Sequence, residues 1–144
     1  MPTVRDVVSR KGQNVVTVAP DCTVLEAARI MMQGRIGGVL VCENDKVVGI
    51  FTERDVLRRV VAEQRVPAET RVSEVMSREL VTVTSATKLD DCSALMTQRR
   101  IRHLPVVDEN DLRGIITPGD LLAFRCSEQE SVIQSLEHYV FDLR

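Results

Sequence analysis

An internal repeat constrains the fold of this chain more than any other sequence feature. Residues 15–57 align without a gap with residues 80–122, at a constant spacing of 65 residues. The identical pairs include Gly49 and Gly114, Thr52 and Thr117, and Asp55 and Asp120. A weaker match relates residues 4–7 to residues 72–75. The chain is therefore a tandem duplication of a unit of roughly 60 residues.

Both copies predict the same order of elements, β-α-β-β-α. The strands are expected at 15–18, 38–42 and 47–51, and again at 80–83, 103–107 and 112–116. The apolar spacing predicts helices that begin after Thr23 and Thr87, each with a capping box to Glu26 or Asp90. Further helices are expected at 53–61 and 118–124. The fold class is α/β (α+β), with helices on one face of each small sheet.

Four segments organise the chain. We expect a first repeat at 1–63, a short polar linker at 64–71, a second repeat at 72–124 and a C-terminal amphipathic helix at 125–144. The linker is too short to separate two independent domains, so the repeats should pack on each other. The last helix is expected to start near Ser127, with Ile133, Leu136 and Val140 on one face. That face packs on its own chain or forms an oligomer contact.

Composition excludes several classes of function. The 144 residues carry 19 Lys and Arg against 21 Asp and Glu, a net charge of -2 that gives no field for nucleic acid or an anionic membrane. Aromatic residues make up only 3%, which argues against a stacking platform for single strands. No apolar run is long enough to span a bilayer, and the charged start lacks a signal-peptide core. A cytoplasmic protein with four reduced, mostly buried cysteines is expected.

The Thr-x-x-Asp motif at 52–55 and 117–120 has two interpretations. It is a capping box at the start of a helix, which needs no ligand. The same helix start also suits a phosphate, and the aspartate suits the vicinal hydroxyls of a ribose. A second cluster precedes the middle strand of each copy, where Gly37 and Gly38 leave room for a flat ring and Arg102 and His103 suit phosphate.

Catalysis has little support in the sequence. The two histidines, His103 and His138, lie in different segments, and there is no HExxH, P-loop or GxGxxG motif. Asp90 and Asp91 are adjacent on a helix, so they point in different directions. The four cysteines form no CxxC pair. We expect no catalytic residue and no metal site.

The repeat resembles the cystathionine-β-synthase (CBS) domain, and the tandem resembles a CBS pair, or Bateman module. The resemblance covers about residues 4–124 and rests on residues 15–18, 49–55, 100–108 and 114–120. With its helical tail, the chain is similar to small stand-alone bacterial CBS-pair proteins. The resemblance implies two repeats packed through their sheets about a pseudo-two-fold axis, with two clefts that bind AMP, ADP, ATP, NAD(H) or S-adenosylmethionine. It also implies a homodimer and a regulatory rather than enzymatic role.

The resemblance assigns residues to each cleft. In the first cleft it implies that Val16 and Thr17 lie near the base and that Ile36, Gly37 and Gly38 form the wall. It implies that Arg102 and His103 approach the phosphate and that Thr117 and Asp120 bind the ribose and phosphate. The second cleft is implied to use Val81, Thr82, Ile101, Thr52 and Asp55, together with His103. Leu40 stands where the second copy has Pro105, and the first copy lacks the basic pair. This asymmetry favours the cleft that ends in Thr117 and Asp120.

The predicted function is a sensor. An adenosine-containing ligand binds between the repeats and biases their relative angle or the shape of a homodimer, and an unidentified protein target responds. The alternative is a protein–protein interaction module with no physiological nucleotide.

Overall fold

The computed structural model describes the backbone of residues 1–12 and 15–142 and the side chains up to residue 137. The strands are β1 (Thr17–Val18), β2 (Gly38–Glu43), β3 (Lys46–Thr52), β4 (Leu104–Asp108) and β5 (Asp111–Ile116). The helices are α1 (Val4–Lys11), α2 (Val24–Gly34), α3 (Glu53–Asp55), η1 (Val56–Val61), η2 (Pro67–Glu69), α4 (Val72–Val75), α5 (Leu89–Arg99) and α6 (Pro118–Asp142). The side chains of His138 and Val140, and the whole of Leu143, lie outside the described part.

Each copy forms a small sheet around an antiparallel hairpin, as predicted. β2 pairs with β3, and β4 pairs with β5. The turns place Asn44, Asp45, Glu109 and Asn110 at positive φ, the conformation of a tight type I′ hairpin turn. The first strand of each copy is shorter than the expected four residues. β1 runs parallel to β2 over two residues, and in the second copy only Val83 bridges to Val106.

The two copies exchange their first helices. One hydrophobic core contains Val4, Val7 and Val8 of α1 together with buried residues of β4, β5 and α5. The other contains Val72 and Val75 of α4 together with buried residues of β2, β3 and α2. The helix that precedes each copy in sequence therefore packs in the core of the other copy, and neither core is complete without the opposite half.

Two predictions about helix limits need correction. Residues 118–142 form one continuous helix, α6, and not separate helices at 118–124 and from Ser127. Half of the expected box at α2 is present: the Thr23 hydroxyl accepts the Glu26 N–H at 3.1 Å, while the Glu26 carboxylate accepts from Cys22 Sγ and not from the Thr23 N–H. The expected Thr87–Asp90 box is absent: α5 begins after Lys88, and the Thr87 hydroxyl accepts the Thr84 N–H at 3.1 Å. The repeat itself aligns Thr23 with Lys88, which has no hydroxyl to cap with.

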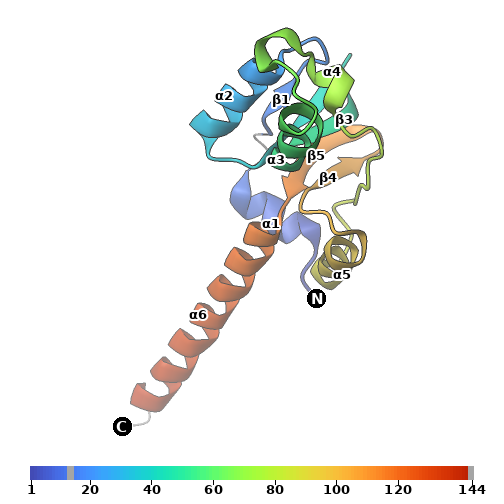
Figure 1. The fold of residues 1–144 in the computed structure, drawn as a ribbon. Helices are drawn as coiled ribbons and strands as arrows, with labels where there is room; N and C mark the ends of the chain where they lie inside the picture. Colours follow the sequence, from blue (N-terminus) through green and yellow to red (C-terminus); the bar gives the residue numbers. More distant parts are fainter. Residues whose placement is uncertain (13–14, 143–144) are drawn as a thin grey trace.

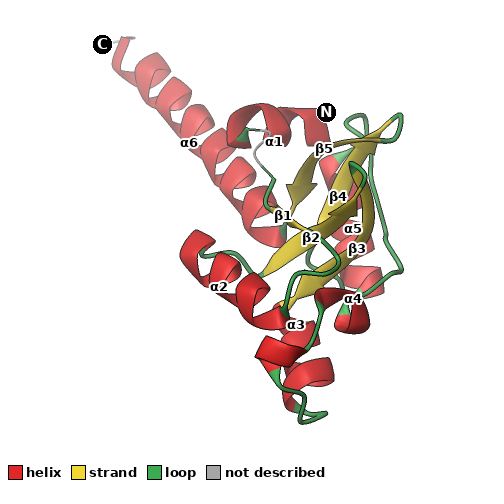
Figure 2. Ribbon diagram, turned by 90° about the horizontal axis from the view of Figure 1, so that it is seen from above, coloured by secondary structure: helices red, strands yellow, loops and turns green. Residues whose placement is uncertain are grey.

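The architecture is a mixed α/β fold with two small sheets side by side and helices around them (Figure 2). β3 and β5, the last strands of the two hairpins, approach each other between the halves. α6 leaves the body and projects away from it (Figure 1). Within the described residues no helix is both long and apolar enough to cross a membrane.

Candidate functional site

The Thr117–Asp120 motif caps α6 and leaves part of the aspartate free. Asp120 Oδ2 accepts the Thr117 backbone N–H at 2.9 Å and the Thr117 hydroxyl at 3.0 Å. Lys11, at the end of α1, donates to the same oxygen at 2.8 Å and to the Ile115 carbonyl at 3.0 Å. Asp120 Oδ1 makes no hydrogen bond within the described part of the chain, and 18% of the side chain is exposed. One carboxylate oxygen therefore serves the cap and Lys11, and the other has no hydrogen-bond partner among the described residues.

The equivalent aspartate in the first copy, Asp55, is buried and hydrogen-bonded within the protein through both carboxylate oxygens. Asp55 is only 6% exposed. Its Oδ2 accepts the Thr52 backbone N–H at 3.0 Å, and its Oδ1 accepts the Ser77 hydroxyl at 3.2 Å. Arg59 Nε lies 3.9 Å from the same Oδ1. Because both oxygens have partners inside the fold and the side chain is nearly buried, Asp55 is less accessible to a ligand than Asp120.

The pseudo-symmetric partners Gly38 and His103 meet between the two halves. A Cβ at Gly38 would lie 3.0 Å from His103 Nε2 and 3.0 Å from Thr52 Cγ2. The space above Gly38 is therefore filled by the imidazole and does not admit the flat ring that the sequence suggested. A Cβ at Gly37 would lie 3.5 Å from the Glu53 carboxyl group. The structure thus brings Gly37, Gly38, Thr52 and His103 together, across the assignment to two separate clefts.

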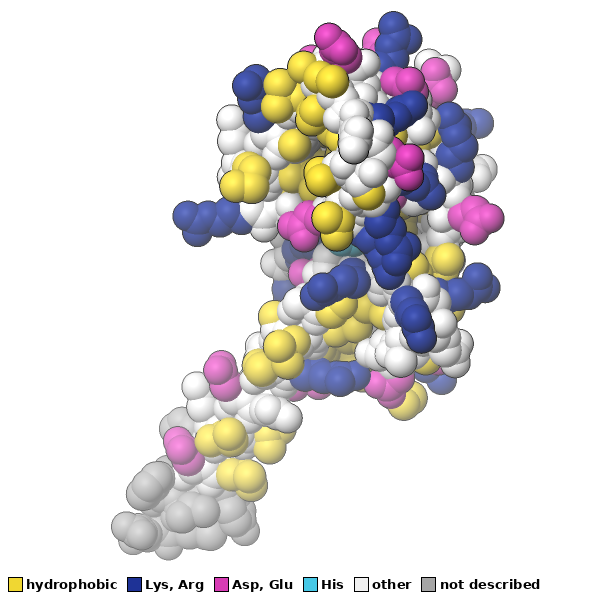
Figure 3. Space-filling view, viewed as in Figure 1, with side chains coloured by type: hydrophobic (Ala, Val, Ile, Leu, Met, Phe, Trp, Pro, Cys, Tyr) yellow, Lys and Arg dark blue, Asp and Glu magenta, His cyan; other side chains and the backbone are white. Residues whose placement is uncertain are grey.

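A basic pocket lies beside the start of α6. It has a volume of about 550 Å³, and its lining includes Arg54, Arg100, Arg102 and Arg125, with no carboxylate among its described lining residues. Its floor is apolar, with Met96, Ile101, Pro118, Leu121 and Leu122. Basic side chains surround this region of the surface in Figure 3. Arg125 is also 3.7 Å from the exposed Asp90 carboxylate, which lies outside the lining, and the four guanidinium groups together favour an anionic group such as phosphate.

The remaining predicted site residues lie around this centre. Ile101 and Arg102 line the basic pocket. Ile36 and Val81 are partly buried against the cores of their own copies, and Val16 is 41% exposed just before β1. Thr17 and Thr82 are exposed at the starts of the two copies. None of these five positions lines the basic pocket, and all of its lining residues except Arg54 come from residues 93–125.

Sequence reasoning missed three residues of the site, Lys11, Arg54 and Arg125. Arg54 lies inside the first Thr-x-x-Asp motif, and its Nη1 donates to the Arg100 carbonyl at 3.2 Å, which carries a first-copy cation into the second-copy pocket. The position of Arg54 inside the Thr52–Asp55 motif was the one sequence feature that could have indicated its role. Lys11 reaches Asp120 only because α1 packs on the second copy. No local pattern in the sequence indicates that contact.

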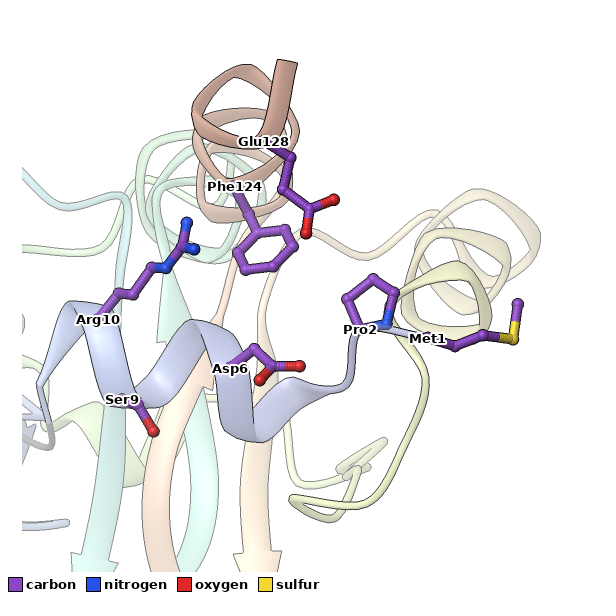
Figure 4. Close-up of a pocket in the computed structure, with 7 residues that line it drawn as sticks. All are labelled: Met1, Pro2, Asp6, Ser9, Arg10, Phe124 and Glu128. Atoms are coloured by element: carbon purple, nitrogen blue, oxygen red, sulfur yellow. The ribbon is translucent and has the colours of Figure 1, made fainter. Parts of the chain in front are cut away.

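A second cavity, of about 390 Å³, lies where α1 meets α6 (Figure 4). The Arg10 guanidinium stacks 4.6 Å from the centre of the Phe124 ring, and its Nη1 donates to the Ser127 hydroxyl at 3.1 Å. Asp6 and Glu128 also line the cavity. These contacts fasten α1 to the base of α6, and none of the predicted site residues takes part.

The thiols are poorly suited to nucleophilic chemistry. Burial and the neighbouring Glu26 raise the pKa of Cys22 to about 11. Burial also raises the pKa of Cys42 and of Cys92. A thiol with a raised pKa carries little thiolate at neutral pH. Cys126, contrary to the expectation of mostly buried thiols, is exposed on α6.

His103 connects the two sides of the site electrostatically. Burial lowers its pKa, and the cations of Arg102 and Lys11 lower it further, whereas the carboxylates of Glu53 and Asp120 raise it. The imidazole is therefore neutral at pH 7 and lies within the influence of both the arginine pocket and the Lys11–Asp120 pair.

A pH dependence of stability follows from this lowered pKa. As the pH falls below about 6.5, the unfolded chain takes up a proton on His103 that the folded chain resists, so the free energy of unfolding falls. Below the lower folded pKa the loss levels off. Urea unfolding between about pH 5 and 7.5 should show a steeper loss for the wild type than for His103→Gln. Parallel curves for the two proteins would contradict this role of His103.

The repeat, the paired hairpins and the two aspartates that cap helices are features of a known family. The model of the CBS domain matches residues 4–62 and 72–126. The chain belongs to the CBS domain family and carries two such domains in tandem.

Three relatives illustrate the likeness. The chain is 39% identical over 140 residues to the CBS domain-containing protein YhcV of Bacillus subtilis (strain 168), which covers 96% of this chain and 97% of that protein. A solved structure of a protein with CBS domains from Burkholderia ambifaria MC40-6 superposes with a TM-score of 0.85 at 37% identity, covering 89% of this chain and 96% of that one. The CBS domain pair of protein MJ0100, solved in complex with 5'-methylthioadenosine and S-adenosyl-L-methionine, has a TM-score of 0.78 at 23% identity, over 89% of this chain and 98% of that chain. This last likeness is one of fold.

Proposed function

We propose that this chain is a regulatory module that binds a phosphorylated adenosine nucleotide at the start of α6. The ribose hydroxyls bind the free oxygen of Asp120, and the phosphate binds the arginines of the basic pocket. The observation that carries the proposal is the asymmetry of the two aspartates: Asp120 keeps Oδ1 without a hydrogen bond in the described part of the chain, and Asp55 does not.

Charge supports a phosphate-bearing ligand. The four arginines of the pocket would attract AMP, ATP or NAD(H), and they would oppose the positive sulfonium of S-adenosylmethionine. The amino end of α6 adds the positive end of its helix dipole. A CBS pair of the same fold, MJ0100, binds two adenosyl compounds. We propose the same adenosyl class here, with phosphate as the distinguishing group.

The proposal places one nucleotide in each chain. In the second predicted cleft, around Val81, Thr82, Ile101, Thr52 and Asp55, a ribose would compete with the Ser77 hydroxyl for Asp55 Oδ1, while Oδ2 keeps its bond to Thr52. Asp55 is only 6% exposed, so a ligand would have to displace Ser77 from a nearly buried carboxylate, whereas Asp120 Oδ1 has no such competitor among the described residues. Occupancy at the Asp120 side alone is therefore favoured.

The exchanged helix α1 provides a route for signalling. Lys11 of α1 donates to Asp120, so a ligand that binds this carboxylate changes the contact that holds the end of α1. Because α1 completes the core of the second copy, a shift of α1 changes how the two halves fit. A ligand drives such a change only through different affinities for the two arrangements. A protein target or the partner of a homodimer would then bind one arrangement of the two halves more tightly than the other.

Calorimetry with adenosine, AMP, ATP, NADH and S-adenosylmethionine tests the proposal. We expect AMP and ATP to bind below millimolar concentration and more tightly than adenosine or S-adenosylmethionine. Arg102→Gln should weaken AMP by roughly ten-fold and leave adenosine almost unchanged, because only AMP has the phosphate. Equal loss for AMP and adenosine would contradict the assignment of Arg102 to phosphate.

An interaction module without a nucleotide is the second candidate, and one observation favours it. Lys11 already neutralises Asp120, and the imidazole of His103 already fills the space over Gly38. A chain whose clefts serve only as structure would bind none of the five compounds below millimolar concentration. It would still capture its protein target, with the same affinity whether or not nucleotide is present.

A further inference from the structure

The outer half of α6 lacks a partner in the single chain. The base of the helix is held by the buried Leu121 and Phe124, and by the bond from Arg10 to Ser127. From residue 128 to residue 137, every described side chain is exposed. Figure 1 shows the helix extending away from both sheets. An isolated helix of this length is marginal in water, so the projection needs a partner to be stable.

The exposed face of α6 carries the spacing of a coiled coil. Steps of four, three, four and three residues connect Leu122, Cys126, Gln129, Ile133 and Leu136, and all five are exposed. We call this row the α6 seam. In a heptad, Cys126 and Ile133 occupy position a, and Leu122, Gln129 and Leu136 occupy position d. A β-branched residue at a with leucine at d favours two parallel strands. Yellow apolar side chains follow this part of the helix in Figure 3.

The charges beside the seam favour a second copy in parallel orientation. Arg125 occupies position g, and Glu130 occupies the e position that faces it from the other strand of a parallel pair. In its own chain, Arg125 Nη2 donates to the Ser93 hydroxyl at 3.2 Å and lies 3.7 Å from Asp90 Oδ1, and the Arg125 side chain is 57% exposed. Because Nη2 makes both contacts, the other guanidinium N–H groups can serve Glu130 of a second copy. An antiparallel pair would set e against e, which confronts Glu130 with Glu137. Glutamates along the helix also disfavour an anionic membrane, which selects Lys and Arg.

We propose that α6 pairs with α6 of a second copy of this chain as a parallel two-stranded coiled coil along the α6 seam. The interface begins beside the body at Leu122 and continues outward at least to Leu136. The two Cys126 side chains face each other near the base. The proposal does not rest on the proposed nucleotide site, although Leu122 and Arg125 line the basic pocket as well as the seam; Ile133 and Leu136, which carry the test, lie outside that pocket.

Sedimentation of the full chain tests the seam. The double variant Ile133→Asp/Leu136→Asp places charge in the interface, and we expect it to weaken dimerisation at least about 100-fold. Ser131→Asp/Ser135→Asp adds the same charge to the same turns outside the seam, and it should remain dimeric. All four residues are exposed and lie outside both cores, so the body should stay folded in both variants, and circular dichroism should show a smaller helical signal only in the seam variant, whose outer α6 loses its partner. A monomeric wild type, or a dimer that survives the seam substitutions, overturns the proposal.

Oxidative cross-linking tests the orientation. In a parallel pair the two Cys126 thiols occupy the same layer, so a mild oxidant should convert the wild type into a covalent dimer. Cys126→Ser should lose this product, and Cys42→Ser should keep it. A wild type that gives no covalent dimer, or a Cys126→Ser variant that still gives one, overturns the parallel arrangement.

Discussion

Asp120→Ala should weaken AMP binding by roughly 10- to 100-fold, the cost of losing charge-assisted hydrogen bonds to the ribose hydroxyls. The substitution also removes the cap of α6, which costs about 1 kcal/mol of folding free energy. The base of α6 is held by the buried Leu121 and Phe124, so the variant should remain folded. Calorimetry measures the affinity, and thermal unfolding measured in parallel checks the fold.

Lys11→Met is the matched control for this variant. It breaks the same ion pair as Asp120→Ala, and it leaves the carboxylate in place. If Asp120 acts on the ribose, Lys11→Met should bind AMP at least as well as the wild type, because the carboxylate loses a competing cation. If Asp120 acts only by holding α1, both variants should lose affinity alike. That second result would remove Asp120 from the binding site.

The contrast between Asp120 and Asp55 shows the limit of a repeat as a guide to function. The two aspartates have equivalent positions, equivalent threonines and equivalent caps. Their surroundings differ because the exchanged segments differ. Ser77, beyond α4, donates to Asp55, and Lys11, at the end of α1, donates to Asp120. The motif predicts the cap, whereas the exposure of the second oxygen depends on a segment far away in sequence.

Local patterns predicted the hairpins and the helix starts at Thr52 and Thr117, because these depend on residues close together in the chain. The exchange of α1 and α4 was not predictable in this way. The spacing of Val4, Val7 and Val8 says that one face of α1 is apolar, but it does not say which core that face enters. The meeting of Gly38 with His103 similarly depends on the axis between the copies. The repeat aligns these two residues, but only the packed structure shows that they touch.

The two glycines at equivalent positions in β3 and β5 permit a test of the exchange by stability. At each glycine a segment of the other copy crosses the strand: Met76 and Ser77 cross β3 at Gly49, and α1 crosses β5 at Gly114. A Cβ at Gly49 would lie 2.6 Å from Met76 Sδ and 3.0 Å from the Ser77 carbonyl oxygen, whereas a Cβ at Gly114 would lie 3.3 Å from Val8 Cγ2. Ser77 is also fixed to the strand by two backbone hydrogen bonds with Ile50, each of 2.9 Å. The segment over Gly49 therefore has less freedom to move than the helix over Gly114.

Gly49→Ala should reduce the free energy of unfolding by about 1–3 kcal/mol, and Gly114→Ala by less than about 1 kcal/mol. The added methyl group at Gly49 must displace Met76, which is only 4% exposed, or break the pairing of Ser77 with Ile50. At Gly114 a small shift of one valine methyl group is enough. Urea unfolding of the two variants gives the comparison directly. If both variants lost the same free energy of unfolding, the close contact of Met76 and Ser77 with β3 at Gly49 would be contradicted.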